Sequence, residues 1–155
     1  MQLYVMRHGN AVPSGQSDAK RPLTQLGEQE AALMANWLHQ QDICFEHIFV
    51  SPFCRAQQTA NIVAQHFHET IVSETLSFIT PSGNAKGFHD YLDGTQLSGN
   101  VLVVSHMPFV SYLVSELTAG QASPIFQTAA IAHIHYDRDK MSGDLVRLVS
   151  PYDLL

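Results

Sequence analysis

Apolar residues along this chain form two kinds of pattern, short continuous runs and longer stretches with helical spacing. The continuous runs predict buried strands at Leu3–Met6, His47–Val50 and Val101–Ser105. The third run, VLVVS, is rich in β-branched residues, which suit a sheet covered on both faces. Weaker or alternating patterns predict three further strands: Ile71–Ser73, Ala129–Tyr136 and Leu145–Val149.

Between the strands, apolar residues recur every three or four positions, which predicts helices with one buried face. Four helices are expected: Thr24 to about Gln40, Ser51-Pro52 to about Phe67, Asn84–Leu92, and a last one that follows Pro108 and includes Leu117. The segment Val12–Pro22, rich in Ser, Gly, Pro and Asp, predicts a loop. Strands that alternate with helices predict one α/β domain over residues 1–155, with three layers (α/β/α) and a mostly parallel central sheet.

The composition excludes several classes of protein. Charged residues make up 14% of the chain and the net charge is −6, which argues against a nucleic-acid binder because such a protein needs a basic face. Hydrophobic residues make up 45%, enough to bury a core and to exclude a disordered chain. The start, MQLYVMRHGN, does not resemble a signal peptide, and no apolar run is long enough to span a membrane. Cys44 and Cys54 lack the spacing of a disulfide framework, which predicts reduced thiols and a cytoplasmic location.

Three of the predicted strands end just before residues that bind or react with phosphate. These are Arg7-His8-Gly9 after the first strand, Ser51-Pro52 with Arg55 after the second, and Ser105-His106 around the end of VLVV. Ligands of an open α/β sheet bind beyond the carboxyl ends of its strands. If these strands are adjacent and parallel, two histidines and two arginines converge on one spot, within reach of Arg21 from the first long loop.

Such a group of side chains fits phosphoryl chemistry. The planar guanidinium of arginine matches the oxygens of a phosphate and stays charged. A neutral imidazole is a good nucleophile toward phosphorus, and a second imidazole, if protonated, adds positive charge near the phosphoryl oxygens. The N-terminus of the helix after Ser51-Pro52 can also face the anion. Catalysis of this kind needs positioning and charge but no metal or other cofactor.

The ordered motifs MRHGNA, RPLTQLGEQEA, VSPFCRAQQTA and VVSHMPFV resemble those of the histidine phosphatase (phosphoglycerate mutase-like) superfamily. The short length and the RPLT and SHMP sequences look most like the SixA-type phosphohistidine phosphatases. The resemblance implies that His8 is the nucleophile and forms a phospho-His8 intermediate, which water then hydrolyses. It also implies that Arg7, Arg55 and His106 hold the phosphoryl oxygens.

Other residues of these motifs are expected to complete the site. Arg21, at the RPLT position, is expected to support the pocket or contact the substrate, and Gly9, Asn10 and Ser51 are expected to line the substrate site. Asn10 is placed to orient water or a pocket residue. A backbone carbonyl is expected to hold the second ring nitrogen of His8, because the attacking nitrogen must keep its lone pair.

One departure from the superfamily pattern bears on the substrate. Many relatives carry an acid, shortly after the third strand, that protonates an alkoxide leaving group. Here the segment reads SETLSFITPSG, with Phe78 at the expected acid position and Glu74 too early in register. The length of 155 residues also leaves no room for the large cap insertion that covers the site in most relatives. An imidazole leaving from a P–N bond needs less help from an acid, and an uncapped pocket admits a histidine on another protein.

These features predict a phosphohistidine phosphatase that acts on a phosphorelay or phosphotransferase protein, such as a histidine phosphotransfer domain. Two alternatives stay open, a small-molecule phosphomonoesterase or mutase of the same superfamily and a non-catalytic phosphate-binding module. Two histidine pairs, His66/His68 and His133/His135, resemble metal ligands, but neither has a third ligand at suitable spacing. Cys54 lacks the loop spacing of a cysteine phosphatase, so we interpret it as a packing residue.

Overall fold

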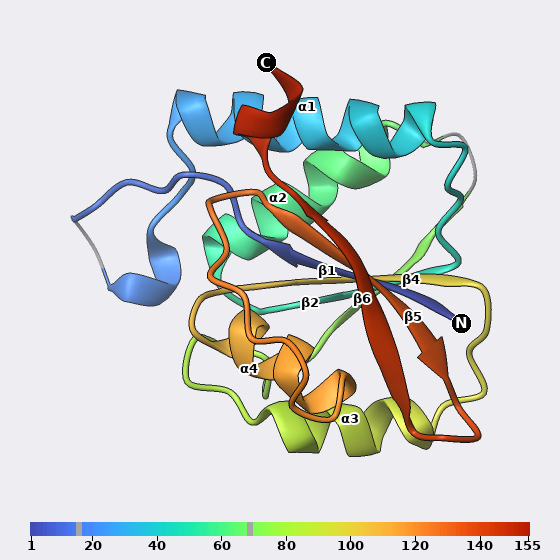
Figure 1. Cartoon of the computed structure of the whole chain (residues 1–155). Coiled ribbons are helices and arrows are strands. Elements are labelled where there is room, and N and C mark those ends of the chain that lie inside the picture. Colours follow the sequence, from blue (N-terminus) through green and yellow to red (C-terminus); the bar gives the residue numbers. More distant parts are fainter. Residues whose placement is uncertain (15–16, 68–69) are drawn as a thin grey trace.

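A six-stranded sheet runs through the middle of the computed structural model, which describes residues 1–14, 17–67 and 70–155 (Figure 1). The strands are β1 (Gln2–Arg7), β2 (His47–Val50), β3 (Val72–Thr75), β4 (Asn100–Ser105), β5 (Ile131–Asp137) and β6 (Ser142–Val149). They lie in the order β3-β2-β4-β1-β5-β6. The first four in this order are parallel, whereas β5 and β6 form an antiparallel hairpin at the other edge. The prediction of a mostly parallel sheet is confirmed.

Helices cover both faces of the sheet (Figure 1). They are α1 (Gln25–Gln40), α2 (Cys54–Gln65), α3 (Ala85–Asp93) and α4 (Phe109–Leu117), with two short 3-10 helices, η1 (Asp18–Lys20) and η2 (Pro151–Leu154). Alternate residues of β1 point to opposite faces, so Tyr4 and Met6 pack with residues of α1 and α2 while Leu3 and Val5 pack with residues of α3 and α4. The molecule is therefore a single compact α/β domain with the three predicted layers.

The register of the parallel strands brings the predicted functional segments to one edge of the sheet. Arg7 is paired with Ser105 at the ends of β1 and β4, and Val50 is paired with Val104 at the ends of β2 and β4. The chain leaves all three strands at the same level, which confirms that these strands are adjacent and parallel. η1 lies at the same side of the molecule, away from the N-terminus (Figure 1).

Several predicted boundaries are wrong by a few residues. The third strand covers Val72–Thr75 rather than Ile71–Ser73, because its four residues pair with His47–Val50 of β2. The second helix begins at Cys54, after an extended Phe53, and ends at Gln65. The predicted first loop contains the short helix η1, which no apolar periodicity announced because none of its residues is buried.

Two further expectations concern the whole chain. Within the described ranges, no helix is both long enough and apolar enough to cross a membrane. Cys44 and Cys54 are not joined in a disulfide.

Candidate active site

His8 is held by its backbone at the point where the chain leaves β1. Its amide donates to the carbonyl of Ser105 (3.0 Å), and its carbonyl accepts from the amide of Ala129 (2.9 Å). The ring is also held, since Nδ1 lies 2.6 Å from the carbonyl oxygen of Gly9. A carbonyl only accepts, so Nδ1 carries the hydrogen and the lone pair of the neutral ring is on Nε2. The backbone carbonyl expected to fix this ring is therefore that of Gly9.

Arg55 and His106 both lie next to the His8 ring. Arg55 Nε donates to His8 Nε2 over 3.2 Å, from the first turn of α2. The ring of His106, just beyond β4, has its centroid 5.0 Å from that of His8. Phe53 packs edge-on against His106 (5.1 Å) and under the Arg55 guanidinium, whose carbon is 5.1 Å from the ring centroid. Three of the predicted groups are therefore in one place.

Arg7 and Ser51 complete this group. Ser51 Oγ lies 2.7 Å from His106 Nε2, and Arg7 Nη1 donates to the carbonyl of Phe126 (2.8 Å). Two buried nitrogens, Arg7 Nε and His106 Nδ1, have no hydrogen-bond partner among the residues that the structure describes. Buried polar atoms are nearly always paired, so these two nitrogens point to a polar ligand at this place.

Arg21 joins the site through Asp18. One carboxylate oxygen of Asp18 lies 2.8 Å from Arg21 Nη2, and the other lies 3.2 Å from Arg55 Nη2. Arg21 Nη1 also donates to the carbonyl of Val12 (2.7 Å). The structure thus connects Arg21 to Arg55 by a shared carboxylate, rather than by a direct contact with His8.

Asn10 and Gly9 connect the site to the start of α1. Asn10 Oδ1 accepts from the Thr24 hydroxyl (2.8 Å), and the backbone N–H of Asn10 donates to Glu30 Oε1 (2.8 Å), so these hydrogen bonds face α1 and not the His8 ring. A Cβ on Gly9 would stand 2.5 Å from the carbonyl oxygen of Gly27, so this close approach of two backbones requires glycine. The loop that carries His8 is therefore packed directly on a helix.

Sequence reasoning missed four residues that support the site: Phe53, Asp18, Thr59 and Glu30. The Thr59 hydroxyl accepts from the amide of Gly9 (3.1 Å) and donates to the carbonyl of Arg55 (2.8 Å), so it joins the loop after β1 to helix α2. Its position in the SPxxRAxxT motif is a signal that could have identified it. Asp18 lies in a loop with no motif, and nothing in the local sequence distinguishes it.

The electrostatic surroundings keep both histidines neutral. Burial, together with the cations of Arg55, Arg7 and Arg21, lowers the pKa of His8 to about 4, although its hydrogen bond to Gly9 acts in the opposite direction. Burial and then the neighbouring His8 and Arg55 lower the pKa of His106 to about 2. At neutral pH both rings are uncharged, so His106 adds no positive charge before a ligand binds.

Neither Phe78 nor Glu74 is placed to act as a general acid. Phe78 packs on the Tyr91 ring with centroids 5.4 Å apart. Glu74 is engaged elsewhere, since its carboxylate accepts from the Tyr91 hydroxyl (2.8 Å) and lies 3.2 Å from His47 Nε2. The structure therefore commits Glu74 to partners on α3 and β2.

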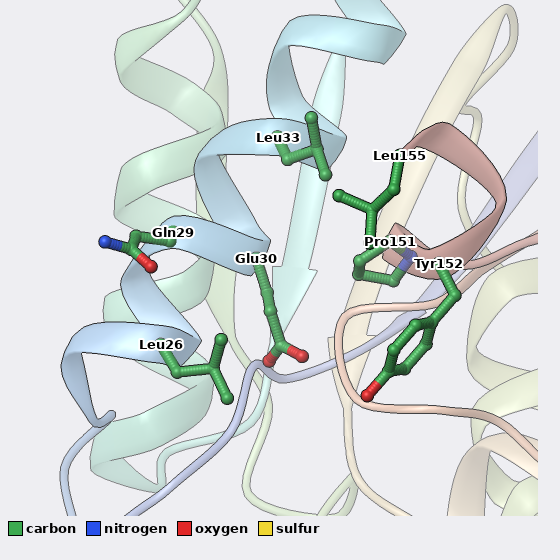
Figure 2. Close-up of a pocket in the computed structure, with 7 residues that line it drawn as sticks. All are labelled: Leu26, Gln29, Glu30, Leu33, Pro151, Tyr152 and Leu155. Atoms are coloured by element: carbon green, nitrogen blue, oxygen red, sulfur yellow. The ribbon is translucent and has the colours of Figure 1, made fainter.

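A mainly apolar hollow lies between α1 and η2, apart from this group of residues (Figure 2). Leu26, Leu33 and Tyr152 line it, and the side chain of Glu30 reaches past it toward the loop after β1. It carries none of the predicted site residues, so the chemistry belongs to the strand ends and not to this pocket.

No metal site is evident in residues 1–14, 17–67 and 70–155, where no three His, Cys, Asp or Glu side chains are grouped to hold an ion. His133 Nε2 and His135 Nδ1 both contact the side-chain amide of Gln2, at 2.6 and 2.7 Å. His68 of the other pair lies outside the described residues.

Comparisons with known proteins point in one direction. Residues 3–77 match the histidine phosphatase superfamily (branch 1). The chain is 43% identical over 156 residues to the phosphohistidine phosphatase SixA of Escherichia coli (strain K12), which covers 99% of this chain and 96% of that protein. It is 38% identical to the phosphohistidine phosphatase SixA homolog of Haemophilus influenzae (strain ATCC 51907 / DSM 11121 / KW20 / Rd), over 97% of both.

A solved structure is similar over the full length of both chains. The protein histidine phosphatase SixA complexed with tungstate shares 40% sequence identity and a TM-score of 0.95 with this structure, covering 100% of each chain.

Proposed function

This chain belongs to the histidine phosphatase superfamily, and we propose that it is a metal-independent phosphohistidine phosphatase whose substrate is a phosphorylated histidine on another protein. The relatives named SixA, similar over nearly the whole chain, support the activity and the kind of partner. The observation that carries the proposal is the His8 ring, fixed in one tautomer, with Arg55 bonded to its Nε2 and the His106 ring beside it.

In the first step, His8 Nε2 attacks the phosphoryl group in line with the bond to the substrate imidazole. A bond forms between His8 Nε2 and phosphorus while the P–N bond to the substrate breaks. The substrate ring, protonated on its other nitrogen, takes that electron pair and leaves as neutral imidazole, while phospho-His8 carries the positive charge. The guanidinium groups of Arg7 and Arg55 hold the phosphoryl oxygens, because planar, permanently charged donors stabilise the charge spread over them. Arg7 Nε and His106 Nδ1, which are buried and lack partners among the described residues, supply further hydrogen bonds.

In the second step, a water attacks phospho-His8 from the side that the substrate imidazole has left. The new P–O bond forms as the P–Nε2 bond breaks, one proton of the water passes to a phosphoryl oxygen, and inorganic phosphate departs as H₂PO₄⁻. The lone pair returns to His8 Nε2, and Nδ1 keeps its hydrogen on the Gly9 carbonyl throughout. The lowered pKa of His8 supports this cycle because the ring starts and ends it neutral.

The leaving group favours phosphohistidine over a phosphate ester. An alkoxide requires a proton from a general acid, but Phe78 occupies the expected acid position and Glu74 is engaged by Tyr91 and His47. General acid catalysis contributes about 10²–10⁴-fold, so an ester would be hydrolysed slowly here.

The finer assignment is a histidine phosphotransfer domain or a similar phosphorelay protein as partner, in the cytoplasm. The lack of a large cap insertion among the described elements supports a substrate histidine presented by a folded protein. Two cysteines that are not joined in a disulfide support a reducing compartment.

The proposal is tested by comparing kcat/KM for a histidine phosphotransfer domain phosphorylated on its histidine with kcat/KM for a sugar phosphate, whose leaving group is an alkoxide. We expect a preference of about 10²-fold or more for the phosphohistidine protein, because only its leaving group dispenses with an acid. Equal turnover of the two would favour a small-molecule phosphomonoesterase. Binding of the phosphoprotein without release of phosphate would favour a non-catalytic module.

A further inference from the structure

The guanidinium of Arg55 has its donors occupied within the protein itself. Nε donates to His8 Nε2 (3.2 Å), Nη1 donates to the backbone carbonyl of Asp18 (2.7 Å), and Nη2 faces the Asp18 carboxylate (3.2 Å). Arg55 is only 3% exposed, whereas the Asp18 side chain is 58% exposed. The short helix η1 therefore covers the arginine that a phosphoryl group must reach.

The Asp18 carboxylate bridges two guanidinium groups much as a phosphoryl group would. Its Oδ1 accepts from Arg21 Nε (2.9 Å) and lies 2.8 Å from Arg21 Nη2, while its Oδ2 pairs with Arg55. The hydrogen bond to Arg21, and then that to Arg55, lowers the pKa of Asp18, so the carboxylate is fully ionised at neutral pH. An anion of this chain is thus already bound to the cations that select the substrate.

We infer that Asp18 is a positioning residue that holds Arg55 and Arg21, and that a bound phosphoryl dianion displaces its carboxylate from Arg55. This inference rests on the proposed function, because it requires that the phosphoryl group binds to Arg55 beside His8. The exchange is between two anions, since Arg55 gives up the carboxylate and takes the phosphoryl oxygens. It needs no change in the sheet, because Asp18 belongs to an exposed 3-10 turn with no buried residue.

The same exchange frees the nucleophile. While Asp18 is bound to Arg55, His8 Nε2 accepts a hydrogen bond from Arg55, and a lone pair that accepts a hydrogen bond is not available to attack phosphorus. When Arg55 turns its donors to the phosphoryl oxygens, the lone pair of Nε2 faces phosphorus. After hydrolysis, the carboxylate of Asp18 competes with inorganic phosphate for Arg55 and so promotes release of the product.

The test is the affinity of the Asp18→Asn protein for tungstate, an oxyanion that occupies a similar volume, measured by titration calorimetry. Removing the resident charge while keeping the side-chain shape should tighten tungstate binding about tenfold, because a like charge a few ångströms from the anion is lost. Asp18→Glu, which keeps the charge, should bind tungstate within about twofold of the unsubstituted chain.

A matched control is Asp42→Asn, which makes the same charge change on an exposed residue just beyond the other end of α1. That helix has 16 residues, so the control lies about 24 Å along its axis, beyond the range of strong interaction in salt solution. Its tungstate affinity should not change.

Tungstate binding does not depend on turnover, so the inference and the proposed function can fail separately. Unchanged or weaker tungstate binding by Asp18→Asn would overturn the inference, since the carboxylate would then assist the anion instead of competing with it. An unsubstituted chain that does not bind tungstate at all would contradict the proposed function as well. A second readout is the ¹⁵N resonance of His8 Nε2, which should move toward that of a free imidazole lone pair when tungstate binds; no movement would also overturn the inference.

Discussion

Two buried histidine centres of this molecule differ in the charge that surrounds them. His8 is 7% exposed and faces Arg55, with the cations of Arg7 and Arg21 nearby. His89, on α3, is 6% exposed and lies against Glu116 of α4, 3.1 Å away, and the Tyr136 hydroxyl of β5, 2.7 Å away. Their exposure is nearly the same, so burial alone does not distinguish them.

The difference lies in what each ring is joined to. The Tyr136 hydroxyl also donates to Asp93 (2.8 Å), so the His89 centre links two helices and a strand through polar bonds, and burial followed by that bond raises the pKa of Tyr136. The His8 ring keeps a lone pair on Nε2, among cations that attract an anion. A buried histidine surrounded by cations can serve as a nucleophile toward an anion, whereas a buried histidine bonded to a carboxylate and a hydroxyl serves as a cross-link.

The largest predicted effect is the loss of turnover when His8 is replaced. His8→Asn should lower kcat on a phosphohistidine protein by about 10⁴-fold or more, because the variant lacks the Nε2 lone pair that attacks phosphorus. Phosphate release from the phosphorylated partner measures this. The matched change at an exposed ring, His135→Asn, should leave kcat unchanged. Full activity of the His8→Asn protein would show that His8 is not the nucleophile.

Arg55→Lys comes next in size. Lysine keeps the charge but lacks the planar set of donors that contacts several oxygens, so kcat/KM should fall about 10²–10³-fold. Steady-state kinetics with the phosphorylated partner provide the measurement. Arg147→Lys, an exposed residue stacked on Trp37, serves as the control and should keep kcat/KM within about twofold. A comparable loss in both variants would mean that the effect is not specific to the site.

At the His89 centre we expect a loss of stability without a loss of turnover. His89→Asn leaves Glu116 and Tyr136 without their common partner, and loss of a buried polar partner costs about 2–3 kcal/mol of stability. Urea denaturation at pH 7 measures this change. The kcat of the folded variant should stay within about twofold of that of the unsubstituted chain. A large loss of kcat in a stable His89→Asn protein would show that the two centres are coupled.

The smallest effect is the dependence of stability on pH. The folded chain keeps His8 neutral down to about pH 4, whereas an unfolded chain protonates it near pH 6.5, so protonation favours unfolding and stability falls as the pH is lowered through this window. Between pH 7 and pH 5, His8 alone should account for about 2 kcal/mol. The fall should be smaller by that amount in His8→Asn, as measured by urea denaturation at both values. An identical pH dependence in the two proteins would contradict the lowered pKa of His8.

Much of the fold follows from local patterns in the sequence. The strand at Val101–Ser105 gives a clear signal because it is buried on both faces, so every residue is constrained. The helix predicted from Thr24 to Gln40 gives a clear signal because its successive turns bury apolar residues. The predicted limits of the third strand are wrong because β3 is an edge strand, exposed at three of its four residues. Its limits are set by pairing with β2. A pairing partner far along the chain leaves no signal in the strand itself.

The residues of the candidate site could be predicted where a motif follows directly after a strand. They could not be predicted where hydrogen bonds between distant parts of the chain determine the position of a side chain. His8, Arg55 and His106 follow strands whose neighbours could be inferred from topology. The two partners of Asn10 on α1, Thr24 and Glu30, depend on how that helix packs on the loop after β1. The role of the carboxylate between Arg21 and Arg55 depends on the path of a loop, which composition does not determine.

The central claim is that His8 carries the phosphoryl group between substrate and water. Its most direct test mixes the protein with a ³²P-labelled phosphohistidine partner, quenches in alkali within milliseconds to seconds, and locates the label by peptide mapping. We predict an acid-labile, alkali-stable phosphate on the peptide that contains His8, which forms and decays at the rate of turnover and is absent from His8→Asn. Phosphate released at the same rate with no label on that peptide would contradict the account.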